Sequence, residues 1–97
     1  MENKAQYYII RCYEAGVFFA QIEKREGNDV TLLNARKIFY WSGAAEVEQL
    51  AMTGPMNPGE CKITMVVPRM TVMNPIQIIP CTQEATDAIE RIAVWKR

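Results

Sequence analysis

The sequence predicts an α+β fold, in which an antiparallel sheet curls into a small, partly open β-barrel and carries two short helices. Aromatic and β-branched stretches alternate with turn residues over roughly the first forty positions, two later segments have the apolar spacing of amphipathic helices, and a second β-rich region lies between those segments. The expected order of elements is βββαββα, which is typical of helices packed on an antiparallel sheet. With 97 residues, the chain is expected to form a single domain over residues 1–97.

The first three strands are expected to form a meander. Residues 7–13 and 17–23 are rich in aromatic and β-branched side chains. The Gly-Asn dipeptide at residues 27–28 closes a second hairpin, which leads into a long strand over residues 29–40. Because the apolar residues of this third strand fall on both parities, a bend is expected near residues 34–35.

Two helices are expected, over residues 42–52 and 83–92. The first begins at Ser42 and is ended by Gly54 and the proline that follows it. The second has Thr82 in position to cap its N-terminus. Each helix has one apolar face, so both are expected to pack on the sheet.

The region between the two helices is expected to add further β structure. Residues 62–67 predict a strand that ends at Pro68. Two short β-rich stretches, residues 71–73 and 76–79, flank the Asn-Pro dipeptide at residues 74–75. They form either one bulged edge strand or a tight hairpin, and the edge position is favoured.

Composition excludes several classes of partner. Eleven Lys and Arg residues balance eleven Asp and Glu residues, and the isoelectric point is near 6.2, so no long-range positive field attracts DNA or RNA. The longest uncharged stretch, residues 70–82, is interrupted by prolines and is too short to cross a bilayer. Residues 1–15 lack the apolar core of a signal peptide. A cytoplasmic protein without membrane or nucleic-acid partners is expected.

The sequence predicts neither an enzyme nor a metal site. It contains no His, which is the commonest general base and a common metal ligand, and it lacks the usual hydrolase, phosphate-loop and zinc motifs. The three cysteines are widely spaced and odd in number, which argues against a disulfide framework. Cys61 or Cys81 could act as a nucleophile only if a base other than His activated it. We therefore interpret the cysteines as core residues and expect no cofactor.

Residues 34–45 give the strongest indication of a binding site. Two cations, three consecutive aromatic residues and a small-residue helix start occur within these twelve positions. Together they would offer a guanidinium, rings for stacking and free backbone N–H groups, which suits a nucleotide-like anion. Cations on other strands could complete the site. The candidate ligand-binding residues are Arg11, Asn34, Arg36, Phe39, Tyr40, Trp41, Ser42, Gly43 and Arg69.

Each of these features also has a structural interpretation. A cation on a strand often pairs with a neighbouring carboxylate. Tyr40 can belong to the core and Trp41 can anchor a helix, while Ser42 can be an N-cap and nothing else. Three adjacent rings cannot all point to one face of a strand, so at least one is expected to reach a second surface.

Short motifs extend along nearly the whole chain: Tyr7, Arg11, Ala15-Gly16-Val17, Asn34-Ala35-Arg36, Ile38-Phe39-Tyr40-Trp41, Gly43-Ala44, Gln49-Leu50-Ala51, Cys61-Lys62, Cys81-Thr82 and Val94-Trp95-Lys96. With them, residues 7–95 resemble a family of small tailed-phage and prophage proteins that is labelled as a domain of unknown function. The chain also resembles the phage anti-Thoeris sponges. These bind and sequester cyclic ADP-ribose-type immune signals without degrading them, and some hold cyclic oligonucleotides as larger homo-oligomers.

The leading hypothesis is therefore a phage-encoded, non-catalytic sponge for a cyclic nucleotide signal. Arg36 and Arg69 would pair with phosphate oxygens, one aromatic ring would stack on the base, and Arg11 would complete the site from a neighbouring strand or subunit. Two other hypotheses stay open. One is an inhibitor that binds a host defence protein through an exposed aromatic and methionine surface, which includes Met52, Met56, Met70 and Met73. The other is a structural phage accessory protein. A homo-oligomer, at least a dimer, is expected, because a 97-residue chain rich in strand aromatics has too few helices to cover both faces of its sheet.

Overall fold

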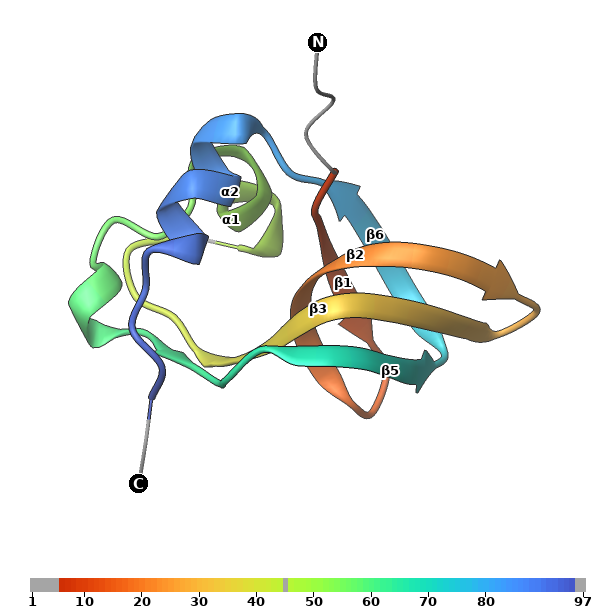
Figure 1. The fold of residues 1–97 in the computed structure, drawn as a ribbon. Helices are drawn as coiled ribbons and strands as arrows, with labels where there is room; N and C mark the ends of the chain where they lie inside the picture. The colour runs from red at the N-terminus through yellow and green to blue at the C-terminus, as the bar shows by residue number, and fades with distance from the viewer. Residues whose placement is uncertain (1–5, 45, 96–97) are drawn as a thin grey trace, which may run out of the picture.

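A computed structural model describes residues 6–44 and 46–95 of the chain (Figure 1). It contains one six-stranded antiparallel sheet, in which β4, β3, β2, β1 and β6 are successive neighbours and β5 also pairs with β3. The strands are β1 (Tyr8–Cys12), β2 (Gly16–Glu26), β3 (Asp29–Tyr40), β4 (Lys62–Ile63), β5 (Val67–Met73) and β6 (Pro75–Pro80). The α+β class and the curled antiparallel sheet are as predicted, and the sheet is not closed into a barrel.

The N-terminal meander follows the prediction closely. Strand β3 has the predicted bounds, and the turn at residues 27–28 joins it to β2. The expected bend is a β-bulge: Arg36 lies opposite Phe19 and Leu33 lies opposite Gln21, so β3 contains one residue more than β2 between these pairs. Asn34 accommodates the bulge with a φ of 52°, in the left-handed region that asparagine tolerates better than most residues.

Strands β4 and β5 divide one edge of β3 between them. The short strand β4 pairs with the end of β3, and β5 pairs with its first half, so the expected single strand over residues 62–67 is wrong. The ladder is interrupted at residues 64–66, where Thr64 makes side-chain and main-chain hydrogen bonds to Lys37. Pro68 does not end a strand but lies inside β5. Strand β5 is at the edge of the sheet, and proline is tolerated there because one side of an edge strand has no neighbouring strand to receive an N–H bond.

Asn74 connects β5 to β6 without forming a hairpin. It has a φ of 56°, donates its N–H to the Asn28 carbonyl at 2.8 Å and accepts the Tyr13 N–H at 3.1 Å. Strand β5 pairs with β3 while β6 pairs with β1, so neither a bulged single strand nor a tight hairpin is correct. The predicted edge position is confirmed for both strands. The chain passes at Asn74 from one edge of the curled sheet to the other.

Two helices and one short 3₁₀ turn complete the fold. Helix α1 (Val47–Thr53) begins five residues later than predicted, and helix α2 (Gln83–Glu90) ends two residues earlier. The caps predicted at Thr82 and Gly54 are confirmed, because the Thr82 hydroxyl accepts the Ala85 N–H at 3.1 Å and Gly54 ends α1 at a φ of 75°. Ser42 is not an N-cap, since Glu46 holds that position in α1. The 3₁₀ turn η1 (Pro58–Glu60) precedes β4. Figure 1 shows α1 and α2 side by side at one end of the sheet.

The curled sheet separates two clusters of buried side chains. One cluster lies between the sheet and the helices, and it includes Ile9, Phe19 and Ile38. The other, which includes Ile10, Phe18 and Leu32, is formed by the opposite side chains of the same strands. Adjacent residues such as Phe18 and Phe19 thus enter different cores. All three cysteines are free and buried, as predicted, and they are divided between the two clusters.

Candidate functional site

Arg36 is buried on the helical side of the sheet, although the sequence alone allowed an exposed charge. Only 4% of the residue is accessible to solvent. Its Nε donates to the Thr64 carbonyl at 2.8 Å and its Nη1 donates to the Ile89 carbonyl at 3.2 Å. The remaining nitrogen, Nη2, is buried and has no hydrogen-bond partner among the described residues. A buried donor without a partner is costly, and among the described residues Nη2 is the buried side-chain nitrogen or oxygen that lacks one.

The local structure explains how Arg36 is held. The bulge at Asn34 turns Arg36 to the same face as Phe19, and the interruption between β4 and β5 frees the Thr64 carbonyl. Ile89 lies in the last turn of α2, where carbonyl groups lack helical partners and the helix dipole is negative. The guanidinium therefore joins three elements and compensates the negative end of α2. Burial lowers the pKa of Arg36 from its ordinary value, yet arginine remains charged in proteins.

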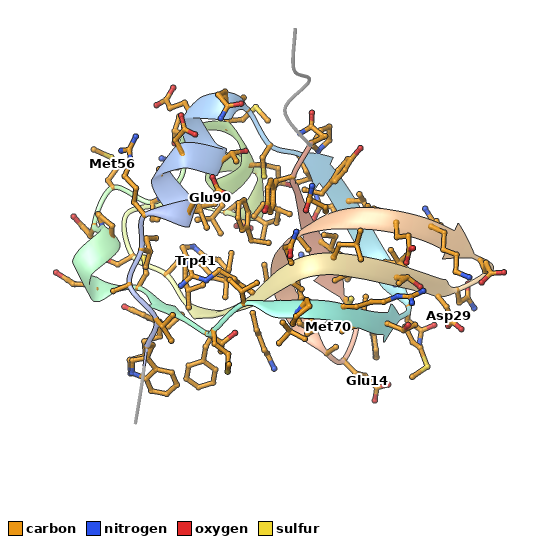
Figure 2. The ribbon with its side chains drawn as sticks, viewed as in Figure 1. Glu14, Asp29, Trp41, Met56, Met70 and Glu90 are labelled. Carbon is orange, nitrogen blue, oxygen red and sulfur yellow. The ribbon has the colours of Figure 1, made fainter. Side chains whose placement is uncertain are left out.

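A small cavity of about 210 Å³ opens beside Arg36. Buried Phe19 and Arg36 contribute to its floor, and the exposed residues Asn34, Val66 and Glu90 contribute to its rim. Tyr7, which is half-buried, completes the lining. In Figure 2, Glu90 lies on α2 at the helical end of the molecule, far from Asp29 at the tip of the β2–β3 hairpin.

Two of the lining residues form a ring pair. The rings of Tyr7 and Phe19 stack with their centroids 4.5 Å apart and their planes inclined by 9°. Burial raises the pKa of Tyr7, and the charge of Glu90 together with a hydrogen bond to its side chain raises that pKa further. The cavity therefore combines a guanidinium donor, a carboxylate acceptor and an aromatic wall.

The three consecutive rings at the end of β3 do not gather around Arg36. Phe39 is 59% exposed and stacks on Trp95 at a centroid distance of 5.3 Å, on the opposite face of the strand from Arg36. Tyr40 is half-exposed and lies under the ammonium group of Lys62, 6.0 Å from its ring centroid. Trp41 packs against the helical core and donates its indole N–H to the Ala44 carbonyl at 3.2 Å. The structural interpretation is therefore correct for Trp41, and it is wrong for Tyr40, which does not belong to the core.

Ser42 and Gly43 do not begin a helix, so the predicted anion site at a helix start is wrong. Their carbonyls accept the N–H groups of Asn57 and Met56, at 3.2 and 3.1 Å respectively. Gly43 has a φ of 88°, and a Cβ atom there would lie 2.8 Å from the backbone nitrogens of Met56 and Asn57. The glycine is therefore required by close approach of two chain segments. This pairing delays the start of α1 to Val47.

The two other candidate cations also lie outside the Arg36 cavity. Arg69 forms an exposed ion pair with Glu23 at 3.0 Å. Arg11 is exposed on β1, where its charge acts on Glu48, the carboxylate that accepts a hydrogen bond from Gln77 at 2.9 Å. Of the nine candidate residues, the structure brings only Asn34 and Arg36 together in this cavity.

Comparison with known proteins identifies the family. The family described as "Domain of unknown function (DUF6948)" matches residues 5–89. The chain belongs to this family. No curated protein and no solved structure matches it.

Metal-binding clusters and reactive thiols were sought among the described residues. Those residues contain no group of three or more His, Cys, Asp or Glu side chains that could hold a metal ion. Burial raises the pKa of Cys81 to about 12 and also raises that of Cys12, which makes both thiols poor nucleophiles near neutral pH. Within residues 6–44 and 46–95, no helix has the length and hydropathy needed to span a membrane.

Sequence reasoning missed four residues of the cavity, namely Tyr7, Phe19, Val66 and Glu90. Three of them carry no local signal, because aromatic and β-branched residues on strands or in loops are ordinary. Glu90 does carry one. A carboxylate in the last turn of a helix opposes the helix dipole, and such a violation of a local preference often marks a functional position.

Proposed function

We propose that the protein is a non-catalytic binding domain that holds a small nucleotide-type ligand at the Arg36 cavity. The observation that supports it best is the buried Nη2 of Arg36, which lacks a partner beside an accessible cavity. A ligand acceptor would satisfy this donor, and a charge-assisted bond in a partly buried site contributes roughly 1.5–3 kcal/mol. The neighbouring ring pair adds a surface for a planar group.

The biological role that we propose comes from the sequence resemblance. In it, a phage-encoded protein sequesters a cyclic nucleotide immune signal of the cyclic ADP-ribose type, or a cyclic oligonucleotide, in the cytoplasm of the infected bacterium, and thereby inhibits antiphage defence. The proposed state is a homo-oligomer of at least two subunits, and no DNA, RNA or membrane partner takes part. Ligand binding without turnover is consistent with a cavity whose polar groups are a guanidinium, a carboxylate, a phenol and an amide.

The test is capture and release of intact ligand. The purified protein is incubated with a mixture of cyclic nucleotide signals, filtered and denatured, and the released compounds are identified by mass spectrometry. We expect one compound to be released unchanged. Altered products would show an enzyme, and no retained compound would contradict the proposal.

A substitution at the rim of the cavity tests in the same experiment whether the ligand enters there. Val66 is 47% exposed and lines the cavity, so Val66→Trp should block entry without disturbing the carbonyl contacts of Arg36. Its neighbour Met65 is 63% exposed and does not line the cavity. Met65→Trp is therefore the matched control and should retain the ligand. Equal retention by both variants would place the ligand elsewhere.

A second candidate function is supported by a different surface. An aromatic cluster lies at the end of β3. It consists of exposed Phe39, exposed Tyr40 and half-buried Trp95, and the Lys62 ammonium lies 5.3 Å from the Trp95 ring centroid. Exposed aromatic side chains are frequent centres of protein interfaces. We propose this cluster as the contact surface if the protein inhibits a host defence protein directly. The predicted methionine surface is not continuous, since Met70 is half-buried and lies far from Met56 in Figure 2.

A further inference from the structure

We propose that the Arg36 cavity binds the edge of a nucleobase, and that the phosphate groups of the ligand stay outside it. This inference rests on the proposed function and assigns the ligand group that enters the site. It reverses the role that the sequence suggested for Arg36, which was to pair with phosphate. Four properties of the cavity support the reversal.

The first property is its charge. Arg36 contributes one positive charge to the cavity, and Glu90 contributes a carboxylate at the rim. A phosphate group that reached Nη2 would have to pass close to this carboxylate, and like charges in a partly buried site repel strongly. Phosphate sites in proteins gather several cations or free backbone N–H groups. The two other candidate cations, Arg11 and Arg69, do not line the cavity.

The second property is the pair of hydrogen-bonding groups. The free nitrogen of Arg36 can only donate, and an ionised carboxylate can only accept. A ligand that satisfies both must present an acceptor and an N–H donor close together. Nucleobase edges have this arrangement, with ring nitrogens or carbonyl oxygens adjacent to N–H groups. A phosphodiester has acceptors only.

The third property is the aromatic wall. One face of Tyr7 lies against Phe19, so an entering ring can stack on the opposite face of Tyr7 or contact the ring edges. Stacking on aromatic side chains is a general way of holding bases. Tyr7 and Glu90 both line the cavity, and the charge of Glu90 acts on the Tyr7 phenol, so the aromatic wall and the carboxylate lie close together.

The fourth property is size. The cavity measures about 210 Å³, less than the roughly 300–1,000 Å³ of pockets that enclose whole drug-sized ligands. It can enclose one heterocyclic ring system but not a complete nucleotide. The sugar and phosphates of a bound nucleotide would then lie over the exposed rim.

The test compares ligand fragments and one rim variant by isothermal titration calorimetry. The probes are guanosine 5′-monophosphate, adenosine 5′-monophosphate, the two nucleosides and ribose 5-phosphate. We expect at least one nucleoside to bind within about tenfold of its nucleotide, and ribose 5-phosphate to bind more than about a hundredfold more weakly. Ribose 5-phosphate binding as well as the nucleotides would overturn the inference and leave the proposed function intact. Failure of all these probes, together with failure of the cyclic nucleotides in the capture experiment, would overturn both.

One substitution distinguishes base binding from phosphate binding in the cavity, because it should change the ligand affinity in opposite directions. If a base N–H meets Glu90, Glu90→Gln should weaken nucleotide binding about tenfold, because the uncharged amide oxygen of glutamine is a weaker acceptor than the carboxylate. If a phosphate enters instead, the same change removes a repulsive charge and should strengthen binding. Glu84→Gln, on the first turn of α2 and outside the cavity, is the matched control and should have no effect. Tighter or unchanged binding by Glu90→Gln would overturn the inference.

Discussion

The two faces of the last part of β3 differ in what they hold. On one face, Arg36 is hydrogen-bonded to α2 and shares a small cavity with Tyr7, which precedes β1, and with residues of β2 and α2. On the other, exposed Phe39 stacks on the half-buried ring of Trp95. These residues are only three positions apart, but alternation along a strand separates them. The sequence therefore suggested that Arg36 and Phe39 share one binding site, whereas the structure places them on two separate surfaces.

The two surfaces should respond differently to truncation, and the largest effect is expected at Arg36. Arg36→Ala removes charged hydrogen bonds to the Thr64 and Ile89 carbonyls and should lower the free energy of unfolding by about 3 kcal/mol. The sequence alone would have predicted an intact fold. Urea denaturation measures the loss. Arg69→Ala, which breaks an exposed ion pair, should cost less than about 1 kcal/mol. Equal losses for the two variants would show that Arg36 does not hold the elements together.

The next largest effect is expected at Asn34, which forms the β-bulge of β3 and also lines the cavity. Its φ of 52° disfavours β-branched residues, so Asn34→Val should lower the free energy of unfolding by about 1–2 kcal/mol. Asn34→Gly should fold as well as the native protein, because glycine adopts this conformation freely. If the glycine variant is as destabilised as the valine variant, the hydrogen bond from Asn34 to Gln21, 2.6 Å long, matters more than the bulge.

A smaller effect is expected on the opposite face. Phe39→Ala removes an exposed ring stack and should lower the free energy of unfolding by about 0.5–1.5 kcal/mol. Retention of nucleotide by this variant should equal that of the native protein, as measured by the capture experiment. Loss of the ligand would move the binding site to the aromatic cluster. Sedimentation of the same variant tests assembly, because weaker association would show that the cluster lies in the predicted oligomer interface.

The smallest effect concerns pH and Tyr7. The pKa of Tyr7 in the folded protein is raised above its ordinary value of 10.0 by burial and by Glu90. The unfolded chain therefore releases this proton first, so the stability contribution of Tyr7 is present below pH 10 and is lost as the pH rises through the folded pKa. Urea denaturation between pH 8 and 11 should show a steeper decline for the native protein than for Tyr7→Phe. Parallel declines would contradict the assignment.

Local patterns predicted the parts of the fold that local chemistry determines. The bounds of β3 followed from its flanking turn and apolar content, and its bulge followed from the change of parity around Asn34. Thr82 and Gly54 were identified as helix caps because capping depends on the residue type next to the end of a helix. The start of α1 could not be predicted, because Ser42 and Gly43 are held by a segment more than ten residues away.

The cavity was predictable only in part. Asn34 and Arg36 were identified because they lie two positions apart in the sequence, yet their partners come from the residue before β1, from β2, from the loop after β4 and from the end of α2. Tertiary packing alone brings these groups together. The sequence correctly predicted that at least one of the three consecutive rings lies outside the core. A strand pattern does not show, however, which ring lines a pocket and which stays on the surface.

The central claim, that the free nitrogen of Arg36 is held for a ligand, can be tested by NMR spectroscopy of the native protein. Isotope-labelled protein is titrated with the captured compound or, before one is known, with guanosine and adenosine 5′-monophosphates. We predict shifts in the Arg36 side-chain N–H signals and in the backbone signals of Tyr7 and Phe19, with little change at the Trp95 indole. Shifts confined to Trp95 and Tyr40, or no shifts at all, would contradict it.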